Sequence, residues 1–295
     1  MNLISLYRFI RGYFHFFFSW RGLPVNRRQL VVDIGSGNNP NIRADILCDL
    51  YPQSNEERSG RLGIWVDERP FVMCDIQALP FRDKVFDYVL CSHLLEHVED
   101  PEKAVQELTR IGKKGRVETP SKLMETVYGW PFHRWRVSRG SDGRLIFEGK
   151  DFSIDGLFPN KVKKSREFEK LVSKFPSEFL VQFEWEGILP VEVRGVPFSS
   201  SNQASFDPEE ISRKITRQRT LRRKIKIFLI RFLRTWISCH SRPILSEILC
   251  CPRCRGVLVE QKGGYACKTC IRLFPELDGI LFFTQKTHVP SAISS

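Results

Sequence analysis

The sequence lacks an apolar run long enough to span a membrane. A spanning helix needs about 20 mostly apolar residues, and the apolar, aromatic stretch of residues 1–20 is interrupted by Arg8, Arg11 and His15. That stretch also ends without the small-residue cleavage site that a secretory signal peptide requires. We therefore expect neither a signal peptide nor a spanning helix, and a cytoplasmic location.

A disulfide framework is also missing. The chain has nine cysteines, an odd number, and five of them follow no regular spacing: Cys48, Cys74, Cys91, Cys239 and Cys250. Small secreted proteins that depend on disulfides carry even numbers of cysteine at framework spacings. A reducing compartment therefore fits this sequence best.

Acidic residues are absent from two segments. Residues 1–30 contain five basic residues and residues 211–246 contain eleven, with no acid in either segment. These 16 positive charges exceed the net charge of +12, so the rest of the chain is mildly acidic. The basic segments, and not the chain as a whole, are therefore the candidates for contact with an anionic membrane surface or with RNA.

The glycine turn at Gly35 and Gly37 lacks the residues of two familiar phosphate-binding loops. A P-loop requires Gly-Lys-Ser/Thr, but Gly37 is followed by Asn38 and Asn39. A dinucleotide fingerprint requires a third small residue where this chain has Pro40. The turn instead reads D-x-G-x-G, beginning at Asp33.

The pattern around this turn predicts an α/β fold. Continuously apolar runs at residues 29–35, 44–50, 69–76 and 85–94 predict strands buried on both faces, which is typical of a parallel sheet. Residues 100–112 predict a helix, with Asp100 as the N-cap and Pro101 in the first turn. A fifth strand is expected at 115–121, and residues 144–150 and 179–195 are expected to return antiparallel at the sheet edge.

These motifs, in this order, resemble the class I S-adenosylmethionine-dependent methyltransferases over residues 31–120. The resemblance implies a Rossmann-like doubly wound sheet, with the glycine turn beneath the methionine part of S-adenosylmethionine and Asp49 on the ribose hydroxyls. It also implies that Asp75 and Ile76 contact the adenine and that Ser92 and His93 lie where methyl donor and acceptor meet. The cofactor-binding residues expected on this basis are Asp33, Gly35, Ser36, Gly37, Asp49, Asp75, Ile76 and Ser92.

The sequence departs from the family where the first helix should follow the turn. Six residues separate Gly37 from Ala44, too few for an ordinary helix. The helix is therefore expected to be shortened or absent, and Arg43 is a candidate to meet the cofactor carboxylate in its place.

Methyl transfer from a sulfonium is a direct displacement that depends mainly on positioning. A general base helps when the acceptor is a hydroxyl or a protonated amine, and the candidates are His93, Glu118 and His133. Glu96 and His97 are expected to orient the adjoining helix or loop. Trp130, Phe132 and Trp135 form either an aromatic lid over the acceptor or part of the core.

Four further cysteines form a C-x2-C-x12-C-x2-C motif: Cys251, Cys254, Cys267 and Cys270. Two such knuckles converge on one tetrahedral zinc, and a set of four cysteines leaves no open position, so the metal is expected to be structural. A redox role for the two pairs is the alternative. Residues 244–283 also resemble small zinc-ribbon proteins that bind and activate methyltransferases acting on RNA and release factors. Because the ribbon is attached here, we expect no separate activator of this kind.

The expected organisation has five parts. They are an N-terminal amphipathic segment (1–28), the methyltransferase domain (29–198), a polar linker with a basic amphipathic helix (199–242), the zinc ribbon (243–285) and a flexible tail (286–295). The apolar residues of the basic helix recur at helical spacing from Leu221 to Trp236, which is typical of a membrane-surface helix or of a helix that covers the catalytic domain. Three functions remain open: a methyltransferase for a small-molecule, lipid-linked or glycan-linked acceptor, an RNA or protein methyltransferase, and a non-catalytic binding protein.

Overall fold

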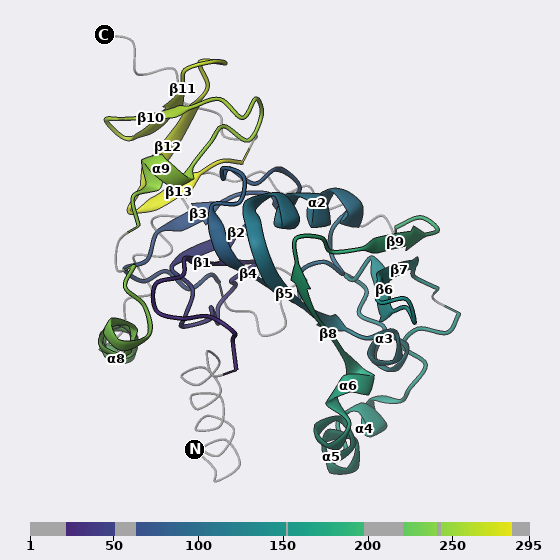
Figure 1. The fold of residues 1–295 in the computed structure, drawn as a ribbon. Helices are drawn as coiled ribbons and strands as arrows, with labels where there is room; N and C mark the ends of the chain where they lie inside the picture. The colour runs from purple at the N-terminus through teal and green to yellow at the C-terminus, as the bar shows by residue number, and fades with distance from the viewer. Residues whose placement is uncertain (1–21, 51–62, 152, 198–220, 241–242, 285–295) are drawn as a thin grey trace.

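The computed structural model of the chain describes residues 22–50, 63–151, 153–197, 221–240 and 243–284 (Figure 1). The polar, serine-rich linker before residue 221 and the C-terminal tail lie outside the described residues. Most of the expected N-terminal amphipathic segment does so as well.

A ten-stranded sheet forms the centre of the molecule (Figure 1). In spatial order its strands are β10 (Leu258–Gln261), β11 (Gly264–Cys267), β12 (Leu273–Leu277), β13 (Ile280–Phe282), β3 (Phe71–Met73), β2 (Ile46–Asp49), β1 (Val31–Ile34), β4 (Phe86–Ser92), β5 (Gly112–Pro120) and β8 (Leu180–Glu186). Every residue of β1, β2 and β3 is buried, as the apolar runs predicted. The expected α/β fold with a parallel core is thus confirmed.

The helix predicted at residues 100–112 is α2 (Pro101–Ile111). Its N-cap is Asp100, whose side chain accepts a hydrogen bond from the Lys103 N–H, and Pro101 occupies the first turn. The apolar side of α2 buries Ala104, Val105 and Leu108 against the main core. Between β1 and β2, residues 35–45 are all described and contain no helix, so the prediction of a lost first helix is confirmed.

The edge of the sheet is only partly as expected. Strand β8 does return antiparallel to β5, with Val117 opposite Phe183. The run at 144–150 does not join this sheet, however, because β6 (Trp135–Arg139), β7 (Leu145–Gly149) and β9 (Val191–Arg194) form a separate three-stranded sheet. Four short helices lie on this side: α3 (Lys122–Tyr128), α4 (Asn160–Lys163), α5 (Arg166–Lys174) and α6 (Pro176–Phe179). The 3-10 helix η1 (Ile76–Ala78) follows β3 and packs against α2.

The C-terminal cysteine module continues the central sheet. After α9 (Leu245–Ile248), strands β10 to β13 form an antiparallel meander whose last strand pairs parallel with β3, with Ile280 opposite Phe71 and Phe282 opposite Met73. Side chains reinforce the junction, since Arg255 donates to Glu107 Oε1 at 2.6 Å. The module is therefore attached to the rest of the molecule by backbone pairing as well as by side-chain contacts.

The basic helix α8 (Leu221–Ile237) lies beside the loop between β1 and β2 (Figure 1). Ile230 and Ile237 are buried with Ile42, and Arg234 Nη2 lies 2.9 Å from Asp45 Oδ1. Five large apolar side chains of α8 stay exposed: Ile225, Phe228, Leu229, Phe232 and Trp236. In the part of the chain that the structure describes, no helix has the length and apolarity needed to span a bilayer.

Candidate active site and metal centre

The predicted cofactor residues gather where the chain changes direction in the sheet. β1 pairs parallel with β2 on one side and with β4 on the other, and the chain reaches β4 only after passing through β3. In open α/β sheets, ligands bind outside the carboxyl ends of the strands at such a switch point. Asp33, Asp49 and Ser92 stand at or next to these ends.

Hydrogen bonds fix the glycine turn against the end of β2. The N–H groups of Gly35 and Ser36 donate to the Cys48 carbonyl at 2.9 Å, and the Gly37 N–H donates to Asp49 Oδ2 at 2.9 Å. Gly35 and Gly37 have φ of 78° and 55°, a region that favours glycine. A Cβ at Gly35 would lie 2.9 Å from Leu94 Cδ2, whereas at Gly37 the nearest atom would be 3.8 Å away.

Two buried polar groups make this turn suitable for a ligand. The Ser36 hydroxyl is buried and has no hydrogen-bond partner among the described residues. Asp33 accepts a hydrogen bond from the Asn41 N–H at 2.7 Å. Burial raises the pKa of Asp33 to about 6, against the lowering effects of Asn41 and Arg69. A polar ligand that donates to Ser36 or accepts from it would remove the cost of the unpaired hydroxyl.

The other cofactor candidates, Asp75, Ile76 and Arg43, have different surroundings. Asp75 caps η1 by accepting from the Gln77 N–H at 2.8 Å, and Ile76 is buried in the main core. Arg43 is also buried, where it donates to Asp45 Oδ2 at 2.8 Å and to the Asn26 carbonyl at 2.8 Å. The expectation that Arg43 meets the cofactor carboxylate is therefore wrong, because its guanidinium is enclosed within the protein.

His93 and Glu118 lie together at the end of β4. His93 has a φ of 53°, and its Nε2 atom is 3.4 Å from Glu118 Oε1. Partial burial lowers the pKa of His93, but contacts with Glu118 and Glu96 outweigh it and raise the pKa to about 10. The two carboxylates thus favour the protonated imidazole of His93, and in that form it donates hydrogen bonds and has no lone pair for a proton. Of this pair, Glu118 is the group able to accept one.

His133 belongs to a buried cluster that the sequence did not predict. Its Nδ1 atom lies 2.6 Å from Glu125 Oε2, and Lys150 forms an ion pair with the same carboxylate. All three side chains are at most 6% exposed. Glu125 comes from α3, Lys150 follows β7, and no sequence spacing relates them. The fold brings them together.

Glu96 and His97 lie beside His133. The ring centroids of His97 and His133 are 4.7 Å apart, at 85° to each other. Burial lowers the pKa of His97 to about 4, so its imidazole is neutral. Burial also raises the pKa of Glu96, but the nearby His93 opposes this effect most strongly and the net shift is downward. An ionised carboxylate therefore faces two imidazoles in the interior.

The three aromatic residues considered for a lid have separate environments. Trp135 is 2% exposed, and its Nε1 donates to the Val98 carbonyl at 2.8 Å, so it belongs to the core. Trp130 stacks on Tyr128, with ring centroids 4.6 Å apart, and Phe132 stacks on His97 at 5.8 Å. A lid role for Trp130 and Phe132 stays a prediction, and for Trp135 it is wrong.

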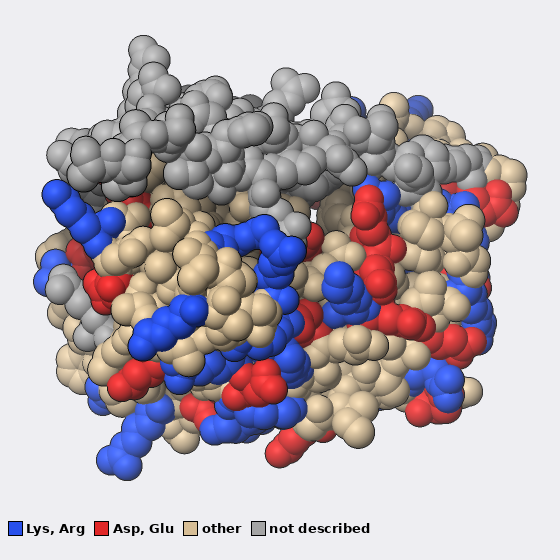
Figure 2. All heavy atoms as spheres, turned by 90° about the horizontal axis from the view of Figure 1, so that it is seen from above, with Lys and Arg blue, Asp and Glu red and all other residues tan. Residues whose placement is uncertain are grey.

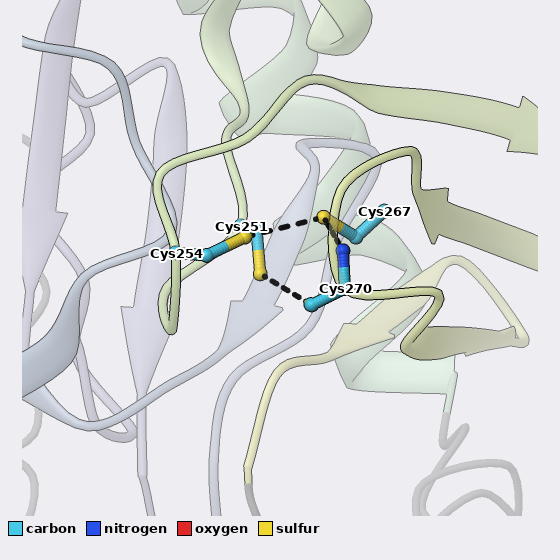
Figure 3. A group of neighbouring side chains, drawn as sticks. All are labelled: Cys251, Cys254, Cys267 and Cys270. Atoms are coloured by element: carbon cyan, nitrogen blue, oxygen red, sulfur yellow. Dashed lines mark hydrogen bonds between the residues drawn. The ribbon is translucent and has the colours of Figure 1, made fainter.

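The four cysteines of the C-terminal module converge as the spacing predicted (Figure 3). Their sulfurs all lie within 4.8 Å of one another, with 3.6 Å between Cys251 and Cys270 and 3.4 Å between Cys254 and Cys267. Zinc–sulfur bonds of about 2.3 Å in a tetrahedron place sulfurs about 3.8 Å apart. The cluster therefore fits a structural zinc ion, which would hold the two knuckles together.

Comparisons with known proteins agree with the fold at this site. Residues 47–117 match a family described as a methyltransferase domain. Demethylmenaquinone methyltransferase of Renibacterium salmoninarum is 32% identical over 123 residues, which cover 38% of this chain and 51% of that protein. The ubiquinone/menaquinone biosynthesis C-methyltransferase UbiE of Xylella fastidiosa is 33% identical over 72 residues, covering 23% of this chain and 28% of that protein. The chain thus spans about half of the first relative and less of the second.

Among solved structures, similarity extends to a complex of the Haloferax volcanii Trm112 methyltransferase activator with a methyltransferase. The match has a TM-score of 0.37 and 16% identity and covers 60% of this chain and 94% of that chain. An S-adenosylmethionine-dependent methyltransferase of Mesorhizobium loti matches with a TM-score of 0.30 and 12% identity, over 57% and 96% of the two chains. Likenesses this weak carry no argument about activity.

Proposed function

We propose that this protein is an S-adenosylmethionine-dependent methyltransferase. The observation that carries the proposal is the glycine turn at the switch point, where the unpaired Ser36 hydroxyl and the Asp49 carboxylate lie at the carboxyl ends of β1 and β2. A carboxylate ending β2 can form two charge-assisted hydrogen bonds with a ribose diol. The methyltransferase-domain match at residues 47–117 supports the same assignment.

In this proposal S-adenosylmethionine supplies an activated methyl group, and the chain supplies positioning. The turn from Asp33 to Gly37 would hold the methionine part, Asp49 the ribose, and Asp75 the adenine. Ser92 and the His93–Glu118 pair, at the ends of β4 and β5, would contact the acceptor. Glu118 would accept the acceptor's proton where one is released, with His93 keeping the carboxylate in place.

The proposal is tested by calorimetric titration of the zinc-loaded protein with S-adenosylmethionine. We expect saturable binding with one site per chain, and competition by S-adenosylhomocysteine, which shares the ribose and adenine. A folded protein that gives no saturable heat of binding with either compound would contradict the enzyme assignment. It would leave the non-catalytic binding protein as the function.

For the acceptor, we propose a lipid-linked or apolar molecule reached at a membrane surface. The exposed apolar side chains of α8 point away from the side that packs on residues 41–45, and Arg231 on the same helix is 69% exposed. A helix with this composition lies in the interface of an anionic bilayer. The quinone methyltransferases to which the chain is similar are named for apolar acceptors, which favours the same class.

Membrane docking predicts flotation with vesicles that contain phosphatidylglycerol. Trp236→Ser should lower the affinity for the vesicles about tenfold or more, since burying such a side chain in the interface contributes roughly 1.5–3 kcal/mol. Ile188→Ser is the matched control, because Ile188 is exposed but lies after β8 and away from α8. Equal flotation of wild type and Trp236→Ser would contradict the role of α8.

RNA is the second partner that the basic segments could bind. Figure 2 shows acidic side chains among the basic ones over the described part of one face, whereas RNA phosphates favour a surface of basic side chains alone. Phosphate-backbone binding depends on such a surface and weakens steeply with salt. Salt-sensitive retention of RNA, without flotation on vesicles, would replace the membrane proposal.

A further inference from the structure

A second cluster of residues of the metal-ligating types lies beside the proposed acceptor site, since Glu96 Oε1 is 3.7 Å from His93 Nδ1. One ligand atom each from Glu96, His97 and His133 can be chosen so that all three lie within 4.8 Å of one another. Glu96 and His97 lie in the loop after β4, and His133 lies in the loop after α3. The two loops are tied together, because the Glu96 carbonyl accepts from the Arg134 N–H at 2.7 Å.

The carboxylate of Glu96 lacks the partners that a buried charge requires. Glu96 is 1% exposed, and neither carboxylate oxygen has a hydrogen-bond partner among the described residues. Its ion-pair partner is the half-exposed His93, whose Nδ1 is 3.7 Å from Oε1. A buried carboxylate whose oxygens have no hydrogen bonds is unfavourable, and a cation bound directly to it would remove that cost.

The two histidines are arranged as metal ligands are. The Nδ1 atom of His97 is buried and has no hydrogen-bond partner in the described part of the chain. His133 directs Nδ1 at Glu125, which leaves Nε2 as its ligand atom. A ligating histidine usually donates its far N–H to a carboxylate, a carbonyl or water, and this bond fixes the tautomer and the ring orientation.

Lys150 in turn holds Glu125, the partner of His133, in place. It is fully buried, pairs with Glu125, and donates to the Trp130 carbonyl at 2.6 Å. The bond to the Trp130 carbonyl anchors the loop that carries His133. The outer groups of a metal site are therefore already in position.

We propose that Glu96, His97 and His133 bind a divalent transition-metal ion. Two imidazoles and one carboxylate suit Zn²⁺ and its first-row neighbours, whereas Mg²⁺ and Ca²⁺ prefer oxygen ligands. In a tetrahedron, bonds of about 2.0–2.2 Å place ligand atoms about 3.3–3.6 Å apart, so the side chains need to close by about 1.5 Å or less. Three protein ligands leave a position open, as in catalytic zinc sites and unlike the four-cysteine cluster.

The open position gives the ion a function beyond structure. Glu96 lies next to His93, at the site where the acceptor is proposed to bind, so an acceptor oxygen or nitrogen could take the fourth position and lose its proton more readily. This role rests on the proposed methyl transfer, whereas the existence of the metal site does not.

Metal counting tests the site without any activity assay. The full-length protein is dialysed to equilibrium against micromolar zinc, and bound zinc is measured by mass spectrometry. We expect two zinc ions per wild-type chain, one on the four cysteines and one on the cluster. Glu96→Gln and His97→Gln should each bind one, and His240→Gln should bind two, because His240 contacts the Arg28 carbonyl outside the cluster.

Two results would overturn the proposal. One is a single zinc in the wild-type chain, which needs no variant and so does not depend on how the variants fold. The other is two zinc ions in a folded Glu96→Gln protein, which would place the second ion elsewhere. Cobalt(II) identifies the site independently, since a cluster of nitrogen and oxygen ligands gives visible absorption without the thiolate-to-metal bands of the four-cysteine site. S-adenosylmethionine binding is measured in parallel, so failure of the metal site and failure of the methyltransferase assignment are distinguished.

Discussion

Replacing Asp49 with asparagine is expected to weaken S-adenosylmethionine binding about 100-fold. Asparagine keeps the size of the side chain and can still accept the Gly37 N–H that Asp49 Oδ2 accepts at 2.9 Å. The glycine turn should therefore keep its shape. What is lost is the negative charge toward the ribose diol, and hydrogen bonds to a charged group contribute about 1.5–3 kcal/mol each. A loss of about 2.7 kcal/mol corresponds to about 100-fold in Kd.

The measurement is calorimetric titration of Asp49→Asn beside wild type, with Asp142→Asn as the matched control. Asp142 lies in the turn between β6 and β7, distant from the glycine turn in the sequence and in the fold, and its replacement changes the net charge by the same amount. Wild-type affinity in Asp49→Asn would remove the ribose role from Asp49. An equal loss in Asp142→Asn would show that overall charge, and not this contact, governs binding.

The central strands could be predicted because burial on both faces leaves a continuous apolar run in the sequence. Every residue of β1, β2 and β3 is buried, as the apolar runs in the sequence predicted. The four-cysteine cluster could be predicted for a related reason, since its spacing alone fixes two knuckles. The absent first helix was also predictable from chain length, because six residues after Gly37 cannot make one.

Contacts between distant segments could not be predicted in this way. The run at 144–150 has a strand pattern, but nothing in it says that its partners are β6 and β9 and not the main sheet. The sequence left Arg43 as a candidate to bind the cofactor carboxylate, but in the fold its guanidinium is buried against Asp45. The cluster around His133 combines the β4 and α3 loops with a lysine after β7, and only tertiary structure sets those neighbours.

The prediction with the broadest structural consequence concerns the four-cysteine cluster. Cys254→Ser is expected to remove one zinc ion per chain and to lower the melting temperature by roughly 10 °C or more. A small ribbon cannot bury enough apolar surface to fold without its metal, so metal binding contributes folding free energy directly. Strand β13 lies at the end of this ribbon and covers the edge of β3, with Leu281 opposite Val72. Loss of the ribbon therefore exposes a buried edge of the central sheet.

Loss of the ribbon should also affect the proposed cofactor site, because the ribbon contacts the segment that follows β3. β3 ends next to Asp75, and Cys250 N–H and Arg255 contact the residues that follow, Pro80 and Leu79. Unfolding the ribbon removes these contacts from the segment that carries the proposed adenine-binding residue. We expect a weaker affinity for S-adenosylmethionine in Cys254→Ser, in addition to the lower melting temperature.

Cys239→Ser is the control, because Cys239 is exposed and lies outside the cluster. Metal content, melting temperature and calorimetric affinity are measured on wild type and both variants. Each zinc-dependent effect should appear in Cys254→Ser and be absent from Cys239→Ser. If Cys254→Ser loses its zinc but melts and binds the cofactor as wild type does, the ribbon folds independently of its metal and the sheet does not need it. The continuous ten-stranded arrangement argues for the first result, because a ribbon that supplies an interior neighbour to β3 cannot unfold without leaving the backbone groups of β3 unpaired.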